Sequence, residues 1–268
     1  RGEIHSKIST AMVGAAAGLD RHHGSGPKVI FSFDYDVQEN GMGEINNHRR
    51  VNDILLGPLE RPTLKWLAAH MPGWVTPDTC TIVGVLGSLG VATSYILTTY
   101  DKNFLWLASF GFVVNWLGDS LDGTLARYRR IERPIYGFFV DHTIDAFSVS
   151  VIMLGLGLTP YVSFNVACLM LISYLLLCVL VFVRTSAVGE FKISYGKLGP
   201  TEIRVFAIFL NAAMYFGGVQ TSLGRTDFLS QIPISLYDLL IAALALLLLY
   251  FFLVTAVKET FKLAKENK

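Results

Sequence analysis

The chain has 268 residues, of which 52% are hydrophobic and only 16% are charged. Soluble globular domains carry about 25% charged residues, so this composition argues against a water-soluble protein. The apolar excess excludes an intrinsically disordered chain, and three cysteines are too few for a disulfide scaffold. The formal net charge of +1 gives no basic field, so no nucleic-acid partner is expected.

Two parts are expected along the chain. Residues 1–57 form an N-terminal segment to which no chemistry is assigned, and residues 58–268 form a membrane domain. Within that domain, residues 58–72 combine apolar side chains with Arg61 and Lys65. This pattern is typical of a short helix lying in the membrane interface.

The apolar segments that follow have the length of transmembrane helices. A helix crosses the bilayer core with roughly 20 apolar residues, and residues 146–183 contain no charge over a stretch too long for one crossing. Turn-forming residues between Gly155 and Pro160 divide that stretch into two helices. The sequence therefore predicts an all-α integral membrane protein with six transmembrane helices, at about 79–100, 103–128, 137–158, 161–184, 200–219 and 236–258.

The basic residues predict the orientation of these helices. Twenty of the 22 Lys and Arg residues lie before the first span, in the second-to-third and fourth-to-fifth loops, and in the C-terminal tail. Only Lys102 and Arg225 lie on the opposite side. Because cytoplasmic loops carry the excess of basic residues, both termini are expected in the cytoplasm.

Four aspartates interrupt the second and third spans. Asp119 and Asp122 are three residues apart near the end of one, and Asp141 and Asp145 are four apart near the start of the next. Each pair is spaced to share a helical face, and the short loop between the two spans places all four at a similar depth. Carboxylates in this setting are costly to insert and repel one another.

Some positive charge must offset the four carboxylates. Arg127 is the one nearby cation on these two helices and cannot neutralise all four. Mg²⁺ and Mn²⁺ prefer carboxylate oxygen ligands, and two such ions form a clamp used in phosphoryl chemistry. The alternative is a set of helix-end aspartates that simply reach the headgroup region.

These residues match a known signature at every fixed position. Asp119-x2-Asp122-Gly123-x2-Ala126-Arg127, nine further residues, and then Gly137-x3-Asp141-x3-Asp145 resemble the motif of the CDP-alcohol phosphotransferase family. That family also has six transmembrane helices, a preceding amphipathic helix, and the motif on its second and third spans. The resemblance covers roughly residues 58–258.

The resemblance implies an enzyme of phospholipid biosynthesis. Family members transfer a substituted phosphate group from a CDP-linked donor to an alcohol and release CMP, and they commonly form homodimers. By resemblance, Asp119, Asp122 and Asp141 would coordinate two divalent cations, Mg²⁺ or Mn²⁺. Asp145 would be the general base on the acceptor hydroxyl and would also touch the second metal.

Further residues receive binding functions from the same resemblance. The CDP moiety would be held by the following residues: Asp122, Gly123, Ala126, Arg127 and Thr79. Thr79 belongs to Thr76-Pro77-Asp78-Thr79, which is similar to a family segment with Asn in place of Asp78; helix capping by Thr76 explains the same residues. Gly137 is expected to allow a close approach of the second and third spans.

The acceptor alcohol is left open by the sequence. His142 and Glu202 resemble the choline and ethanolamine phosphotransferase branch, which joins a CDP-amino alcohol to diacylglycerol. Lys192, Lys197 and Arg204 could instead hold an acceptor phosphate, as in the branch that uses CDP-diacylglycerol and a small alcohol. Glu202 also suits a helix start, and the positive-inside rule explains the basic residues.

Two other classes of protein remain as alternatives. A divalent-cation transporter could use the aspartates as an ion site, but the third and fourth spans offer few polar residues for a pathway. For a purely structural membrane subunit, the spacing of the aspartates would be a coincidence.

Overall fold

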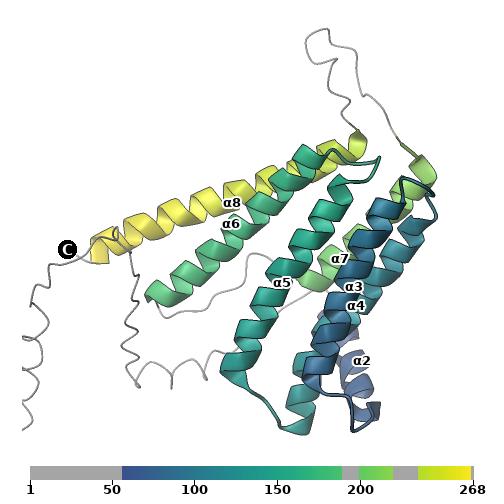
Figure 1. Cartoon of the computed structure of the whole chain (residues 1–268). Coiled ribbons are helices and arrows are strands. Elements are labelled where there is room, and N and C mark those ends of the chain that lie inside the picture. Colours follow the sequence, from purple (N-terminus) through teal and green to yellow (C-terminus); the bar gives the residue numbers. More distant parts are fainter. Residues whose placement is uncertain (1–55, 189–198, 220–234, 267–268) are drawn as a thin grey trace, which may run out of the picture. The chain divides into compact units, whose positions relative to one another are not determined.

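A computed structural model describes residues 56–188, 199–219 and 235–266, and the regular structure in these ranges is entirely α-helical (Figure 1). The all-α prediction is therefore confirmed. The helices of the described residues are α2 (Gly57–His70), α3 (Pro77–Leu97), α4 (Phe104–Arg129), α5 (Pro134–Gly157), α6 (Phe164–Val188), α7 (Pro200–Gly217) and α8 (Leu236–Glu266).

Five of these helices are long and apolar enough to cross a membrane, namely α3, α4, α5, α6 and α8. They indicate an integral membrane protein. Each of them begins within a few residues of the start of a predicted span. The predicted span at 200–219 is present as the helix α7, but α7 is not among the five. Its 18 residues include Glu202, Arg204 and Asn211, so its composition is less apolar. Six spans are thus not confirmed.

The first spanning helix begins as its sequence predicts. The Thr76 hydroxyl accepts a hydrogen bond from the backbone N–H of Thr79, and Pro77 occupies the first helical turn. This cap satisfies one of the free N–H groups that every helix start leaves. The short helix α2 precedes it and packs against α4 through Leu64 and Ala68, next to Leu121 and Leu125.

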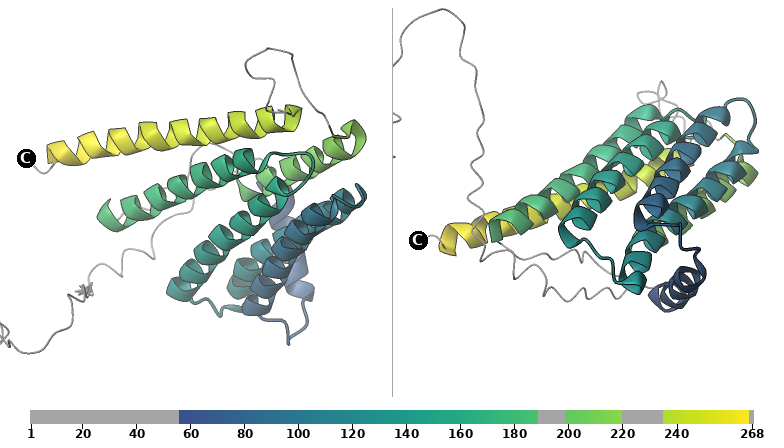
Figure 2. Two further views of the ribbon diagram at one scale, coloured as in Figure 1. Left: turned by 45° about the horizontal axis from the view of Figure 1, so that its top comes forward. Right: turned by 60° about the horizontal axis from the view of Figure 1, so that its bottom comes forward.

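Helices α3 and α4 form the most extensive contact in the described chain, and the views of Figure 2 show them side by side. Glycines make this contact possible. A Cβ added at Gly118 would lie 2.3 Å from the backbone nitrogen of Gly84, and one at Gly87 would lie 2.5 Å from that of Asn115. The backbones therefore touch where no side chain fits.

The prediction of a close approach at Gly137 is wrong. A Cβ at Gly137 would meet no heavy atom within 4 Å, because this residue lies in the exposed first turn of α5. The close contact of α5 is made near its other end and with α3. There a Cβ at Gly155 would come within 2.7 Å of the Cα of Ala92.

Polar side chains join α7 to this helix pair in the apolar interior. Asn211 of α7 accepts a hydrogen bond from the Tyr95 hydroxyl at 2.8 Å and donates one to Ser109 at 3.1 Å. All three residues are buried, so each polar group has a partner where water is excluded. This network joins α7 to the bundle, although α7 is not among the five apolar helices that could cross a membrane.

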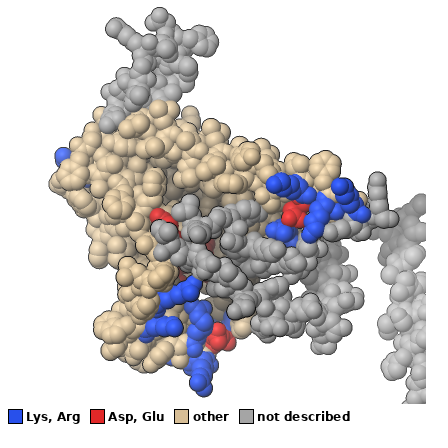
Figure 3. Space-filling model, turned by 180° about the vertical axis from the view of Figure 1, so that it is seen from behind, with Lys and Arg blue, Asp and Glu red and all other residues tan. Residues whose placement is uncertain are grey.

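The charged surface is confined to the ends of the helices. In Figure 3, blue side chains gather over the C-terminal end of α8 and over the lower part of the molecule, and most of the remaining described surface is uncharged. On this face, the uncharged surface is of the kind that a bilayer requires.

Candidate active site

The junction of α4 and α5 brings three carboxylates together. Asp119 lies on α4, and Asp141 and Asp145 lie one turn apart on α5. One carboxylate oxygen of each residue lies within 4.8 Å of the others, and all three residues are partly buried. The cluster forms because a short connection joins the two helices and leaves both aspartate pairs at the same level.

The fourth predicted ligand, Asp122, lies outside the group of three. Its carboxylate accepts a hydrogen bond from the Thr81 hydroxyl of α3 at 2.7 Å and another from the backbone N–H of Gly123. Three residues along a helix rotate a side chain by about 300°, so Asp122 is offset from Asp119 by roughly 60°. That offset turns it toward α3.

A cation on α7 pairs with the cluster. The Arg204 guanidinium lies 2.7 Å from a carboxylate oxygen of Asp119 and donates a second hydrogen bond, of 2.8 Å, to the side-chain oxygen of Asn115. The sequence alone predicts Arg127 as the nearby cation and Arg204 as a contact of the acceptor. Pairing with Asp119 could not be foreseen, because the two residues are 85 positions apart. The signal in the sequence was an arginine directly before an uncharged helical run.

Asn115 was not predicted as a site residue. Its amide donates hydrogen bonds to the Gly84 carbonyl at 3.0 Å and to the Ser88 hydroxyl at 2.8 Å, and its oxygen accepts from Arg204. Asn115 is buried, and it joins α3, α4 and α7 one turn before Asp119. An uncharged Asn within an apolar span is the only sequence signal it offers.

Glu60 of α2 is a second residue that the sequence did not reveal. Its carboxylate accepts hydrogen bonds from the Trp116 indole at 3.0 Å and from the hydroxyls of Ser120 and Thr201 at 3.1 Å. Ser120 follows Asp119 directly, and Thr201 precedes Arg204 by three residues. Glu60 therefore fixes α2 against both helices that contribute to the Asp119–Arg204 pair.

Four of the five predicted CDP-binding residues, all except Thr79, lie along the C-terminal part of α4. The exposed Arg127 side chain folds back over Gly123, where an added Cβ would lie 3.2 Å from a guanidinium nitrogen. Arg127 also donates a hydrogen bond to Thr124 at 3.3 Å, and Ala126 is partly buried on the same segment. A side chain at position 123 would displace the guanidinium.

Thr79 and Asp78 occupy the first turn of α3. The Thr79 hydroxyl lies 2.9 Å from that of Thr76, so both threonines take part in the helix cap. Asp78 pairs with Arg133, the residue before α5, and this hydrogen bond raises the pKa of Arg133 above its ordinary value. The pair gives the unusual Asp78 a structural partner of its own.

Helix-start chemistry accounts for Glu202. It accepts hydrogen bonds from the backbone N–H groups of Gly199 and Leu56, both at 2.9 Å, and it is buried. The first of these bonds completes a capping box at the start of α7. The alternative reading of Glu202 as a capping residue is thus confirmed.

His142 lies beside the cluster, with Nδ1 3.7 Å from an oxygen of Asp141 and 2.8 Å from the carbonyl oxygen of Phe138. Its ring packs against Phe138 and against Phe182 of α6. Lys192 and Lys197, the other predicted acceptor contacts, lie outside the described residues.

The chain is similar in sequence to known proteins. Residues 74–255, more than half of the chain, match the family described as CDP-alcohol phosphatidyltransferase. The chain is similar to cholinephosphotransferase 1 of Danio rerio, with 25% identity over 58% of this chain and 42% of the relative, and to that of Homo sapiens, with 22% identity over 73% and 50%. It is also similar to phosphatidylinositol phosphate synthase of Cutibacterium acnes, with 33% identity over 34% and 40%.

The chain spans about half the length of these two cholinephosphotransferases. The matched range contains every residue of the aspartate motif and all of the helices from α4 to α6. The chain belongs to the CDP-alcohol phosphatidyltransferase family.

Proposed function

We propose that this chain transfers a substituted phosphate group from a CDP-linked donor to an alcohol in phospholipid synthesis, with release of CMP. The observation that carries the proposal is the group formed by Asp119, Asp141 and Asp145, whose oxygens lie within 4.8 Å of one another inside the range that matches the family. Residues 58–268 would be the catalytic membrane domain, and the function of residues 1–57 is left open.

The donor set suits hard divalent cations. Three carboxylates at such short distances would repel one another unless positive charge lay between them. Among these three carboxylates, the described hydrogen bonds of Arg204 reach only that of Asp119. We assign Asp119, Asp122 and Asp141 to two Mg²⁺ or Mn²⁺ ions, and Asp145 would also contact the second ion. Bound there, the ions would neutralise charge on the diphosphate as CMP leaves.

The chain's own residues would orient the reactants. Asp145 would accept the proton of the acceptor hydroxyl, for which a carboxylate must lie within hydrogen-bond reach. Arg127 would bind the diphosphate oxygens, while Gly123 leaves its guanidinium room to fold along α4. Ala126 and Thr79 would contact the nucleotide from α4 and α3.

We place this site at the cytoplasmic face, with both termini in the cytoplasm, because the basic residues are distributed in that way. A site at a membrane surface suits one water-soluble and one lipid partner. Two substrate pairs are compatible with the site: CDP-diacylglycerol with a small alcohol, or a CDP-amino alcohol with diacylglycerol. A homodimer remains part of the proposal through the family resemblance.

The test is metal-dependent CMP release by the purified chain in proteoliposomes, with ion flux followed in the same vesicles. We expect excess chelator to stop CMP release and Mg²⁺ or Mn²⁺ to restore it. Asp119→Asn should raise the metal concentration required for CMP release. Asp101→Asn should not, because Asp101 is exposed in the turn between α3 and α4, at the end of α4 away from the cluster. Metal flux without CMP release would instead support the cation transporter and reject the transferase.

A further inference from the structure

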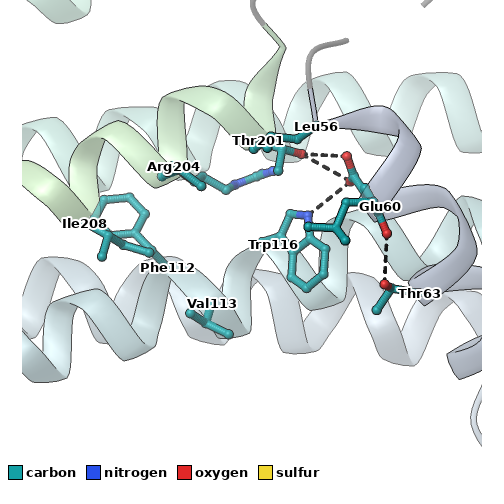
Figure 4. Close-up of a pocket in the computed structure, with 11 residues that line it drawn as sticks. Leu56, Glu60, Thr63, Phe112, Val113, Trp116, Thr201, Arg204 and Ile208 are labelled. Atoms are coloured by element: carbon teal, nitrogen blue, oxygen red, sulfur yellow. Dashed lines mark hydrogen bonds between the residues drawn. The ribbon is translucent and has the colours of Figure 1, made fainter.

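Charged side chains at the helix junctions near the aspartates are paired within the protein. Where α2, α4 and α7 meet, Glu60 accepts hydrogen bonds from the Trp116 indole and the Thr201 hydroxyl (Figure 4). At the end of α4, Arg129 donates hydrogen bonds to three backbone carbonyls in the connection between α2 and α3. The charged groups at the C-terminal ends of α6 and α8 differ from this pattern.

Arg184 of α6 and Glu259 of α8 form an ion pair with unused hydrogen-bonding capacity. A guanidinium nitrogen lies 3.1 Å from a carboxylate oxygen, and the two side chains are only 16% and 19% exposed. The Arg184 Nε and the second carboxylate oxygen of Glu259 are buried and have no hydrogen-bond partner among the described residues. Leaving such groups without a partner costs stability, so a ligand that supplied one would be stabilised here.

Three exposed lysines lie on the same end of α8. Lys258, Lys262 and Lys265 are four and three residues apart, so they share one face of the helix. Basic side chains gather over this end of α8 in Figure 3. Because like charges at such spacings repel and Arg184 already neutralises Glu259, this end keeps an excess of positive charge. We call Arg184 and the three lysines the basic collar.

The basic collar lies at the level of the lipid headgroups. The uncharged run 239–257 of α8 spans about 28 Å of helix, which is close to the thickness of the bilayer core. Lys258 follows this run directly, and on α6 Arg184 likewise ends an uncharged run. The contact of Arg184 with Glu259 places both helix ends at the same level. The other two lysines lie about 6 and 10 Å further along the axis, close enough to act on headgroup phosphates.

An apolar stripe runs beside the lysines. Val257 and Phe261 are 52% and 66% exposed, and they are four residues apart on α8. Each directly precedes a lysine of the basic collar, so a charged and an apolar stripe lie next to each other on the helix. A soluble anion would contact only the charges, whereas a lipid also covers the apolar groups.

We infer that the basic collar binds the phosphate groups of anionic phospholipids in the leaflet that surrounds the C-terminal ends of α6 and α8. Basic residues directly beyond a transmembrane helix attract anionic lipids. Guanidinium and ammonium groups also form charge-assisted hydrogen bonds with phosphate. Binding at the basic collar is independent of the proposed transfer, because the collar lies on α6 and α8 and the aspartates lie on α4 and α5.

The test is photolabelling of the full chain in phosphatidylcholine nanodiscs. Each nanodisc contains a small fraction of a lipid that carries a diazirine near its glycerol backbone and has either a phosphatidylglycerol or a phosphatidylcholine headgroup. After irradiation and pepsin digestion, labelled peptides from the C-terminal end of α8 are quantified by mass spectrometry. The measured quantity is the ratio of labelling by the phosphatidylglycerol probe to labelling by the phosphatidylcholine probe.

Three variants are compared with the wild type. The collar variant replaces all three lysines of the basic collar by glutamine, and the second variant is Arg184→Gln. The control variant removes the same number of positive charges from α2 and from the connection between α4 and α5. Its substitutions are Arg61→Gln, Lys65→Gln and Arg130→Gln.

We expect a wild-type ratio of about ten, because each basic residue near an anionic lipid favours it up to about fivefold and salt screens part of this effect. The collar variant should have a ratio near one, and Arg184→Gln should lower the ratio a few-fold. The control variant should keep the wild-type ratio. Tm values in detergent show that the variants are folded, and Arg184→Gln still tests the collar if the triple variant is not.

A wild-type ratio near one would overturn the inference. An equal loss in the control variant would also overturn it, because labelling would then follow net charge rather than the basic collar. Displacement of the phosphatidylglycerol label by inorganic phosphate, beyond that caused by chloride at the same ionic strength, would show a site for a soluble anion and reject the lipid. Because CMP release is not the readout, failure of the proposed transfer would leave a positive labelling result unchanged.

Discussion

At the scale of single residues, the aspartates of the motif have different surroundings. Asp119 is paired with Arg204, Asp122 accepts hydrogen bonds from Thr81 and Gly123, and Asp145 lies close to both Asp119 and Asp141. In the proposed division of functions, Asp145 moves a proton and Asp119, Asp122 and Asp141 hold the cations.

The first prediction concerns Asp145. Asp145→Asn should lower CMP release by about 10²–10⁴-fold, because the variant has no carboxylate to accept the proton of the attacking hydroxyl. Metal-dependent binding of CDP, measured by calorimetry, should remain within a few-fold of wild type. Near-normal turnover in this variant would show that Asp145 is not the base.

The second prediction concerns Arg204. Arg204→Gln should reduce CMP release by about 10–100-fold, a typical effect of losing a group that orients a metal ligand. Arg204→Lys should recover only part of the activity, because a lysine cannot reach Asp119 and Asn115 with one planar group. Arg184→Gln is the control, since Arg184 forms an ion pair with Glu259 between α6 and α8, outside the cluster. If both glutamine variants retain wild-type activity, Asp119 does not depend on Arg204.

Sequence reasoning identified the cluster but not its supports. The spacing of Asp119, Asp141 and Asp145 is local information, because one short loop connects their helices. Arg204 reaches Asp119, and Glu60 reaches the neighbouring Ser120, through contacts between helices distant in sequence. No periodicity within one helix indicates such a contact. For the same reason Glu202 could be assigned to either of two functions until its backbone partners were known.

At the scale of helices, α3 and α4 depend on glycines that face each other. The backbone approach at Gly84 and Gly118 holds the helix that carries Thr81 against the helix that carries Asp119 and Asp122. Apolar runs in the sequence located these helices but could not show which glycines form contacts. Gly137 and Gly118 are each a glycine close to the aspartate motif in the sequence, yet of the two only Gly118 is in a close helix contact.

The third prediction tests this contact. Gly118→Ala should destabilise the protein by about 1–3 kcal/mol, because its Cβ has no space beside Gly84 and the helices must separate. A lower Tm in detergent should report this loss. Gly90→Ala lies on α3 where an added Cβ meets no heavy atom within 4 Å, so its Tm should stay the same or rise slightly. Equal Tm values for the two variants would mean that the α3–α4 contact adapts to a methyl group.

At the scale of the whole molecule, composition and charge predicted a helical membrane protein, and five apolar helices agree with that prediction. The helix α7 is the exception. Its polar residues form hydrogen bonds with partners at α2, α3 and α4. A hydropathy pattern carries no information about those partners.

The fourth prediction concerns orientation. A cysteine introduced by Lys102→Cys, in the turn between α3 and α4, should react with a membrane-impermeant maleimide in intact cells. One introduced by Arg130→Cys, between α4 and α5, should react only after permeabilisation, because that loop carries the basic residues. Both are compared in a background without the three native cysteines. The reverse labelling pattern would place the aspartate cluster on the opposite face.

The most direct measurement is CMP release from a matrix of donors and acceptors supplied with Mg²⁺ or Mn²⁺. It pairs CDP-diacylglycerol with several small alcohols, and CDP-choline and CDP-ethanolamine with diacylglycerol. We predict chelator-sensitive CMP release from one of these pairs, and none from Asp145→Asn. Folded, metal-supplied protein that releases no CMP from any pair would contradict the assignment of the aspartate cluster to this transfer.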